Sequence, residues 1–293
     1  MNNKLKSFLF AIASIILWST SATAFKLTLK GMSVTHLLLI SSLTSTIIFF
    51  VFEFINNKKN IYLIIKGKDF KNNLVLGIIN PFLYYLILFK AYSILPAQEA
   101  LPLNYTWPIV ISIFSVLFLK NKLTLRTILG LFIAFTGVII IATRGNLISL
   151  HFHNITGVSL AIGSSVVWGL FWILNLLDSR EPSEKLFGSF LFGTILIGIY
   201  TLFFENHFDF EPKYFLGSVY IGFFEMGITF FLWMKALSLS ENKAHTATLA
   251  YLSPFISLIF ISVILGEKLF ASSILGLIFI VGGIIIQQIK TNN

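Results

Sequence analysis

The chain of 293 residues contains no cysteine, so it can form neither disulfide bonds nor thiolate metal sites. Charged residues are scarce as well: they make up 11% of the sequence, against roughly 25% in soluble domains. Patterns of catalytic or nucleotide-binding sites, such as H-E-x-x-H, G-x-S-x-G and the P-loop, do not occur. These absences argue against a soluble domain and against an enzyme, and we expect no cofactor.

Hydrophobic residues, in contrast, make up 56% of the chain, and the mean hydropathy is +0.88. Apolar runs long enough to cross the hydrocarbon core of a bilayer, which takes about 20 helical residues, recur along the whole length. They are continuous and do not alternate with a period of two, which favours helices over barrel strands. The sequence therefore predicts an all-α integral membrane protein with ten transmembrane helices, near residues 7–29, 34–55, 73–95, 98–119, 124–143, 155–177, 186–204, 214–239, 244–265 and 270–289.

The formal charge of +9 is explained by membrane topology. If the N-terminus is cytoplasmic, 14 of the 21 Lys and Arg residues fall in or beside inner loops and four in outer loops, as the positive-inside rule requires. An even number of spans then returns the C-terminus to the cytoplasm. We expect a multi-pass protein of the plasma or inner membrane whose partners are the lipid bilayer and a small molecule, with no nucleic acid.

The chain repeats itself at a distance of about 150 residues. The segment AIASIILW, which ends at Trp18, matches AIGSSVVW, which ends at Trp168. Further matches pair Gly77 with Gly222, Lys90 with Lys235, Tyr105 with Tyr251, Pro108 with Pro254, Lys122 with Lys268, Gly130 with Gly276 and Gly137 with Gly283. We therefore expect two repeats of five helices, residues 1–150 and 151–293.

Since five is odd, the second repeat enters the membrane from the opposite side. Inverted repeats of this kind are typical of transporters, because two like halves can rock about a central site and expose it to either face. The alternative is a duplication that only enlarged a helical bundle.

Polar and aromatic residues interrupt the fourth predicted span near its centre, in the segment LPLNYTWP. Tyr and Trp normally gather at the two membrane interfaces, but Asn104, Tyr105 and Trp107 lie roughly 9 to 14 Å inside at 1.5 Å per residue. Pro108 frees a backbone carbonyl one turn earlier, which is tolerated where it faces protein or water. The segment is typical of a cavity wall, and we expect Pro108 and its counterpart Pro254 to kink their helices.

Other spans contribute similar residues at middle depth. Each alone could serve only in helix packing, but together they predict an aromatic, sparsely polar binding chamber. Trp233 lies near the inner end of its span and is interpreted as an interface anchor. The predicted substrate-binding residues are Trp18, Asn80, Tyr84, Asn104, Tyr105, Trp107, Trp168, Trp172, Glu225 and Tyr251.

Glu225 is an acidic residue about a dozen positions into the eighth span, and the repeat matches it with Asn80. A charge near the bilayer centre costs about 2.5–3.5 kcal/mol, so it usually faces the bundle interior and lies on a transport pathway. Two roles follow: counter-ion for a substrate ammonium group, or carrier of a counter-transported proton. The alternatives are a buried ion pair with Lys26 or Lys90, and a carboxyl group that stays protonated.

Other polar residues indicate less. His151 and His153 could together hold a metal ion, but they lack carboxylate or thiolate company, so no metal site is predicted. Lys90 and Lys235 lie near opposite membrane faces, where their long side chains can reach the interface.

Several short segments resemble the drug/metabolite transporter superfamily, specifically its EamA-type members. They are ILWST at 16–20, VVWGL at 166–170, LGEKL at 265–269 and GLIFIVGG at 276–283. In addition, EALPLNYTWP at 99–108 is similar to the fourth span of the aromatic-amino-acid exporters. That resemblance implies that Asn104, Tyr105, Trp107 and Pro108, with Trp18 of the first span, lie beside the central cavity.

The resemblance and the inverted repeat together predict a secondary transporter, most directly an exporter of small metabolites by alternating access. Amino acids, including aromatic ones, are the first choice of substrate. The alternatives are another substrate class, such as a sugar, a nucleoside or a cationic compound, or else a passive channel or a membrane sensor.

Overall fold

The computed structural model describes residues 3–56, 69–120, 124–146, 153–205, 211–240, 246 and 249–288. Every secondary-structure element in these ranges is helical. Eight helices, some of them built from several shorter segments, are long and apolar enough to cross a membrane, and two shorter apolar helices follow them. The prediction of an all-helical membrane protein is confirmed.

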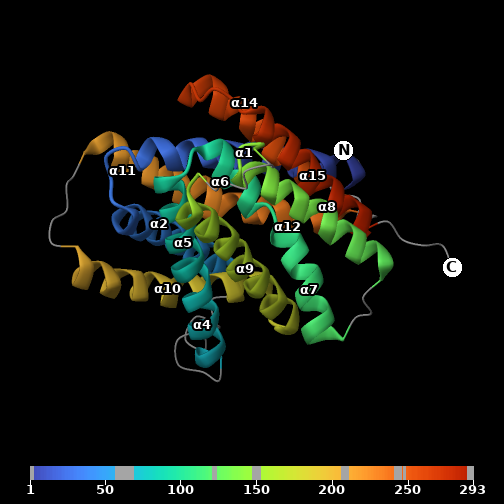
Figure 1. The fold of residues 1–293 in the computed structure, drawn as a ribbon. Helices are drawn as coiled ribbons and strands as arrows, with labels where there is room; N and C mark the ends of the chain where they lie inside the picture. The colour runs from blue at the N-terminus through green and yellow to red at the C-terminus, as the bar shows by residue number, and fades with distance from the viewer. Residues whose placement is uncertain are drawn as a thin grey trace.

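The helices follow one another along the chain as Figure 1 shows. The first half contains α1 (Asn3–Thr28), α2 (Val34–Asn56), α4 (Phe70–Gly77), η1 (Ile78–Leu83), α5 (Tyr84–Ile94), α6 (Ala97–Asn104), α7 (Trp107–Leu119) and α8 (Leu125–Ala142). The second half contains α9 (Ile155–Leu177), α10 (Pro182–Phe204), α11 (Pro212–Tyr220), η2 (Ile221–Ile228), α12 (Thr229–Leu239), η3 (Leu249–Leu252), α14 (Ser253–Leu265) and α15 (Ala271–Gln288).

Four spans are interrupted, and the interruptions fall at equivalent places in the two repeats. The third and eighth spans contain the wide π-helical turns η1 and η2. The fourth span breaks between α6 and α7, and the ninth passes from η3 into α14. Pro108 and Pro254 are each the second residue of the helix after the break, where the missing N–H of proline has no intrahelical partner to lose.

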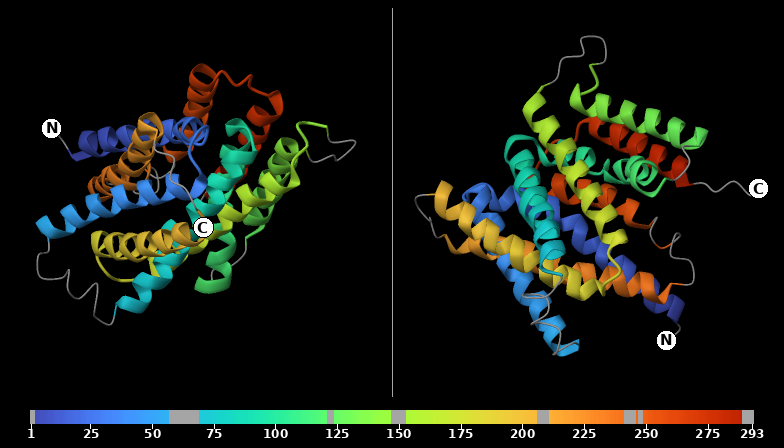
Figure 2. Two further views of the ribbon diagram at one scale, coloured as in Figure 1. Left: turned by 90° about the vertical axis from the view of Figure 1, so that its left-hand side faces the viewer. Right: turned by 90° about the horizontal axis from the view of Figure 1, so that it is seen from below.

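Helices α8 and α15 pack backbone to backbone, because glycines lie where they cross. A Cβ atom added to Gly130 would lie 2.4 Å from the carbonyl oxygen of Gly283, and one added to Gly137 would lie 2.5 Å from that of Gly276. The two helices therefore run antiparallel, side by side (Figures 1 and 2). Since Gly130 matches Gly276 and Gly137 matches Gly283 in sequence, equivalent residues are exchanged across the contact. The two repeats are inverted.

The pair α2 and α10 shows the same exchange. Thr46 and Thr194, each twelve residues after the first residue of its helix, share a hydrogen bond of 2.8 Å between their hydroxyl groups. On one side Gly77 lies against the backbone of Ser189, in α10, and on the other Gly222 lies against that of Ser41, in α2. Small residues thus let the backbones approach at both crossings, as is common in membrane helices.

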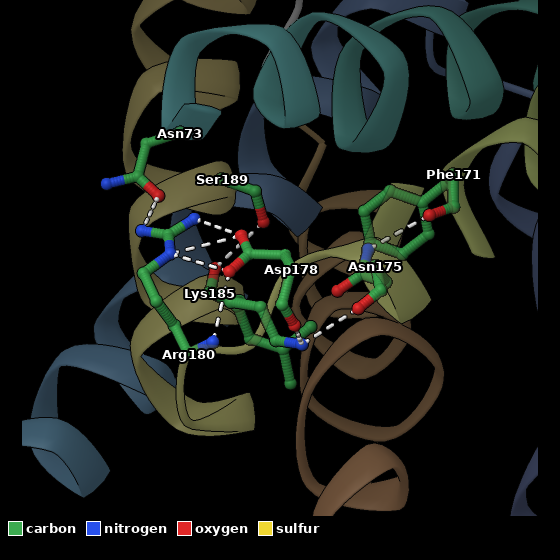
Figure 3. Close-up of polar contacts among 8 residues, drawn as sticks. Asn73, Phe171, Asn175, Asp178, Arg180, Lys185 and Ser189 are labelled. Atoms are coloured by element: carbon green, nitrogen blue, oxygen red, sulfur yellow. Dashed lines mark hydrogen bonds and ion pairs between the residues drawn. The ribbon is translucent and has the colours of Figure 1, made fainter. Parts of the chain in front are cut away.

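A polar cluster ties the connection between α9 and α10 to the first repeat (Figure 3). The Arg180 guanidinium forms an ion pair of 2.6 Å with Asp178 and donates a hydrogen bond of 2.7 Å to Oδ1 of Asn73, in α4. Lys185 donates to the carbonyl oxygens of Asn175 and Asp178, at the end of α9. Partial burial alone would raise the pKa of Asp178, but the hydrogen bonds and charge of Arg180 outweigh it and hold that pKa below its ordinary value.

The α8–α15 crossing can be tested with two adjacent glycines. Gly283→Ala should lower the thermal midpoint of the purified protein by several degrees, because the new Cβ would lie 2.4 Å from the carbonyl oxygen of Gly130. Gly282→Ala is the matched control: a Cβ there meets nothing within 4 Å, and alanine is the better helix former. Equal midpoints for the two variants, measured by thermal unfolding in detergent, would contradict this packing.

Asp178 should make the stability depend on pH in the acid range. Its pKa is depressed in the folded state, so its contribution is present above the unfolded value of about 3.9 and is lost as the pH falls through the lower folded value. We expect Asp178→Asn to lower the thermal midpoint near neutral pH, and the difference from the unchanged protein to shrink below about pH 4. A difference that stays constant down to about pH 3 would be the opposite result.

Candidate functional site

A cavity of about 410 Å³ lies between the two repeats, and helices α1, α5, α6, α7, α9 and α12 contribute to its wall. Nine of the ten predicted substrate-binding residues line it, and Pro108 does too. The nine are Trp18, Tyr84, Asn104, Tyr105, Trp107, Trp168, Trp172, Glu225 and Tyr251. Their part in binding a substrate remains a prediction.

All five tryptophans of the chain line this cavity. Trp18 lies 5.4 Å from Trp233 between ring centroids, and Trp168 stacks on Tyr84 at 4.4 Å. Phe230 lies between the two repeats' tryptophans, 5.9 Å from Trp18 and 6.2 Å from Trp168. The wall is therefore a continuous set of rings whose faces can contact a flat or apolar ligand.

The interpretation of Trp233 as an interface anchor is wrong. Its side chain is only 8% exposed and packs on Trp18 inside the cavity wall. Position in a span gives the depth of a residue but not the direction in which it faces. The sequence spacing could have predicted that Trp233 faces the cavity, because Trp233 follows Glu225 by eight residues and lies on the same side of the helix.

Glu225 is the one acidic residue that the described part of the chain contributes to the cavity wall, and it is held by neutral donors. The hydroxyl of Ser21, in α1, donates to its carboxylate at 2.5 Å, and the phenol of Tyr85, in α5, donates at 3.4 Å. No Lys, Arg or His side chain lines the cavity in the described part of the chain. The described wall of the cavity therefore contains one acidic side chain and no basic one.

The two lysines considered as partners of Glu225 lie in other surroundings. Lys26 donates hydrogen bonds of 2.8 Å to the carbonyl oxygens of Tyr92 and Leu95, at the end of α5. Lys90 is exposed on the surface of the helix bundle. Within the described ranges neither lysine forms an ion pair with Glu225. The alternative of a buried ion pair with Lys26 or Lys90 is therefore wrong.

Asn80, the repeat counterpart of Glu225, does not line the cavity. Its backbone is extended, with φ of −146° and ψ of 123°, inside the turn η1. The adjacent Pro81 packs against Gly193, where a Cβ atom would lie 2.4 Å from the proline ring. The Asn80 side chain is fully buried, and its amide atoms have no hydrogen-bond partner among the described residues. The pattern that matched these two residues predicted their depth but not this local turn.

The remaining polar groups of the wall are neutral. Asn104 donates to the hydroxyl of Ser164 at 2.9 Å and accepts from the phenol of Tyr84 at 3.4 Å. The indole nitrogen of Trp172 is buried and has no hydrogen-bond partner within the described part of the chain.

The cavity reaches the end of the bundle that the basic loops assign to the cytoplasm. There its wall includes Leu176, which is 65% exposed, with Leu237 and Ala250 at neighbouring helix ends. At the other end its wall consists of the buried side chains of Phe25 and Tyr92. Within the described residues the cavity therefore extends to the inner end of the bundle and is closed by buried side chains at the outer end.

Two other features, a second cavity and a pair of histidines, are not candidates for the functional site. A second cavity, of about 440 Å³, lies between α7, α8 and α9 and is lined by apolar side chains and Thr106. Of the two histidines considered as metal ligands, His151 lies outside the described residues. Within those residues, no group of three or more His, Asp or Glu side chains is arranged to hold a metal ion.

Comparison with known proteins gives a family for both halves of the chain. Residues 5–143 and again residues 155–287 match the EamA-like transporter family. A solved crystal structure with a TM-score of 0.69 and 20% identity covers 97% of each chain, which supports the fold alone.

The relatives are distant. An uncharacterized transporter of Archaeoglobus fulgidus is 25% identical over 74% of this chain and 75% of its own length. An uncharacterized transporter of Clostridium kluyveri is 23% identical over 96% and 93%. The aromatic amino acid exporter YddG of Ancylobacter novellus is 24% identical over 62% of this chain, and the match covers 63% of that exporter.

The tryptophan-lined wall predicts an optical signal for binding. A ligand that enters the cavity should change the intrinsic tryptophan emission, because no tryptophan lies elsewhere to dilute the change. Phenylalanine and 2-phenylethylamine are suitable for this titration, since neither contains an indole. Trp168→Phe should reduce the change, and a compound that is transported without altering the emission would count against this cavity as the binding site.

Proposed function

Because the chain belongs to the EamA-like transporter family, we propose that it is a secondary transporter that exports small amphipathic metabolites by alternating access. Amino acids, aromatic ones in particular, are the substrates we expect first. The two repeats, residues 1–150 and 151–293, rock against each other and expose the cavity to one face of the membrane at a time.

The proposal rests chiefly on Glu225 in its aromatic surroundings. A carboxylate with neutral donors and no basic neighbour in the cavity wall is suited to receive a positive group. An ammonium group is such a group, and aromatic faces attract it as well. The rings of Trp18, Trp168 and Phe230 would then contact the apolar body of the substrate.

The carboxylate of an amino acid would meet neutral donors. The phenol of Tyr105 is one of them, because it lines the cavity. The name of the exporter from Ancylobacter novellus supports this substrate class.

Glu225 also suits a proton antiporter. A proton and a substrate ammonium would compete for the same carboxylate, so that release of one accompanies binding of the other. Outward movement of substrate would thereby be coupled to inward movement of a proton.

A second candidate substrate class is an amine without a carboxylate. The observation that favours it is the lack of a basic side chain in the described cavity wall, since a buried carboxylate usually pairs with a cation. Such an amine would need only Glu225 and the aromatic wall for binding, because it has no carboxylate to pair.

Counterflow in proteoliposomes separates these candidates. Vesicles are loaded with phenylalanine, 2-phenylethylamine or 3-phenylpropionate, which share one ring but differ in their ammonium and carboxylate groups. Saturable entry of labelled phenylalanine supports an amino-acid transporter, and entry of labelled 2-phenylethylamine alone supports an amine transporter. Flux that never saturates would support a passive channel instead.

Glu225→Gln should reduce counterflow of the accepted compound by about 10- to 100-fold, as loss of a charge-assisted hydrogen bond implies, and should abolish its dependence on pH. Trp107→Ala should also reduce counterflow, through lost contact area. Glu211→Gln is a suitable control, because Glu211 is exposed and pairs with Lys213 at the surface. An unchanged rate and pH profile in Glu225→Gln would refute the role given to this carboxylate.

A further inference from the structure

Helix α6 borders the outer end of the cavity, and its first residues are fully buried. Helix α6 begins at Ala97, which is 0% exposed, and continues with Gln98 and Glu99, each 2% exposed. These residues lie just beyond Leu101, which still lines the cavity. Some interaction must satisfy the polar groups at this buried helix start.

Glu267 supplies that interaction from the other repeat. Its carboxylate accepts hydrogen bonds from the backbone N–H groups of Ala97 at 3.0 Å and Gln98 at 3.3 Å. A carboxylate is favoured at this position because the first N–H groups of a helix are unpaired and the helix dipole is positive there. Gly266, with a φ of 68°, ends α14 in the left-handed conformation and leads the chain to Glu267.

Gln98 strengthens the same junction in the opposite direction. Its amide nitrogen donates to the carbonyl oxygen of Lys268 at 2.9 Å, and its amide oxygen accepts from the N–H of Phe270 at 2.6 Å. Both acceptor and donor belong to the connection between α14 and α15. These four hydrogen bonds join the start of α6 in the first repeat to the α14–α15 connection of the second, and we call Gln98 and Glu267 the outer latch.

The sequence at the inner end differs at both positions that correspond to the latch. With the match that pairs Tyr105 with Tyr251 and Lys122 with Lys268, Gln98 corresponds to Ala244 and Glu267 to Asn121. Alanine has no side-chain hydrogen-bonding group, and asparagine has no charge. Both positions lie outside the described residues, so this comparison is one of sequence. It shows that the inverted symmetry is broken where the two ends would otherwise be alike.

We propose that the outer latch, Glu267 and Gln98, holds the outer end of the cavity closed and thereby biases the transporter towards the state that is open to the cytoplasm. Both are positioning residues, because they act through the start of α6, which carries Asn104 into the cavity wall. The inference rests on alternating access from the proposed function, but the latch can be tested without any substrate.

The lack of native cysteine makes the test direct. Ala22→Cys introduces one thiol into the cavity wall, in the outer half of α1, with little change in side-chain volume. A membrane-impermeant thiol reagent is applied to intact cells, which present the outer face, and to inside-out vesicles, which present the inner face. The two labelling rates then report how often the cavity is open to each side.

Glu267→Ala and Gln98→Ala, each combined with Ala22→Cys, should raise labelling from outside about fivefold or more and lower labelling from inside. Lys268→Gln is the matched control: it removes the neighbouring charge, but the latch uses only the backbone carbonyl of Lys268, so both rates should stay as in Ala22→Cys alone. The opposite changes on the two faces separate a shift in opening from simple loss of structure.

Three results would overturn the latch. One is unchanged labelling in either latch variant that runs as a monodisperse protein in gel filtration, so that Gln98→Ala decides the matter if Glu267→Ala does not fold. Another is an equal rise of the outside labelling rate in Lys268→Gln. The third is a latch variant in which the labelling rates from both faces rise together. A labelling shift without counterflow of any ligand would support the latch and refute the transport proposal, and counterflow with unchanged labelling would do the reverse.

Discussion

The absence of water in the hydrocarbon core is the constraint on which this structure depends. Backbone groups there must be satisfied within the protein, so helices can be interrupted only where the freed groups face other helices or a polar cavity. The interruptions obey that rule: the break before Trp107 and the turn η2 around Glu225 border the cavity, and the turn η1 packs against α10. The helix interruptions at Trp107 and Glu225 thus coincide with the candidate site.

The chemistry of that site follows from a difference between the repeats. At equivalent positions one repeat has Asn80, which is sealed among packed helices, and the other has Glu225, which faces the cavity. Duplication gave the cavity two similar walls of aromatic rings, whereas divergence gave it a single charge. The connection between α14 and α15 differs in sequence from the equivalent connection between α7 and α8, since Glu267 corresponds to Asn121. In the proposed mechanism the symmetry would supply the two alternative openings, and asymmetry at a few residues would decide which substrate is bound and which opening is favoured.

Much of this could be predicted from the sequence, because hydropathy, charge distribution and internal repetition are long-range averages. They gave the ten spans, the inversion and nine residues that line the cavity. What they could not give was the direction of individual side chains: Trp233 lies at a helix end but faces inwards, and Asn80 lies at middle depth but outside the cavity. Those directions depend on local turns and on which neighbouring helix is small enough to approach. The hydrogen bonds between Glu267 and the start of α6 join residues 169 and 170 positions apart, and no periodic pattern encodes them.

The glycine crossings of α8 and α15 have a consequence for how the molecule moves. Where backbone touches backbone, no flexible side chain lies between the helices to absorb sliding or separation. Any large relative displacement at this crossing would therefore break contacts that nothing replaces. The two glycine pairs, Gly130 with Gly283 and Gly137 with Gly276, define a line along the contact. One helix can rotate about this line relative to the other far more easily than it can slide past it. If the repeats rock as proposed, the α8–α15 pair would act as a fixed pivot, and the distance that a helix travels between the two states would grow with its distance from that pivot.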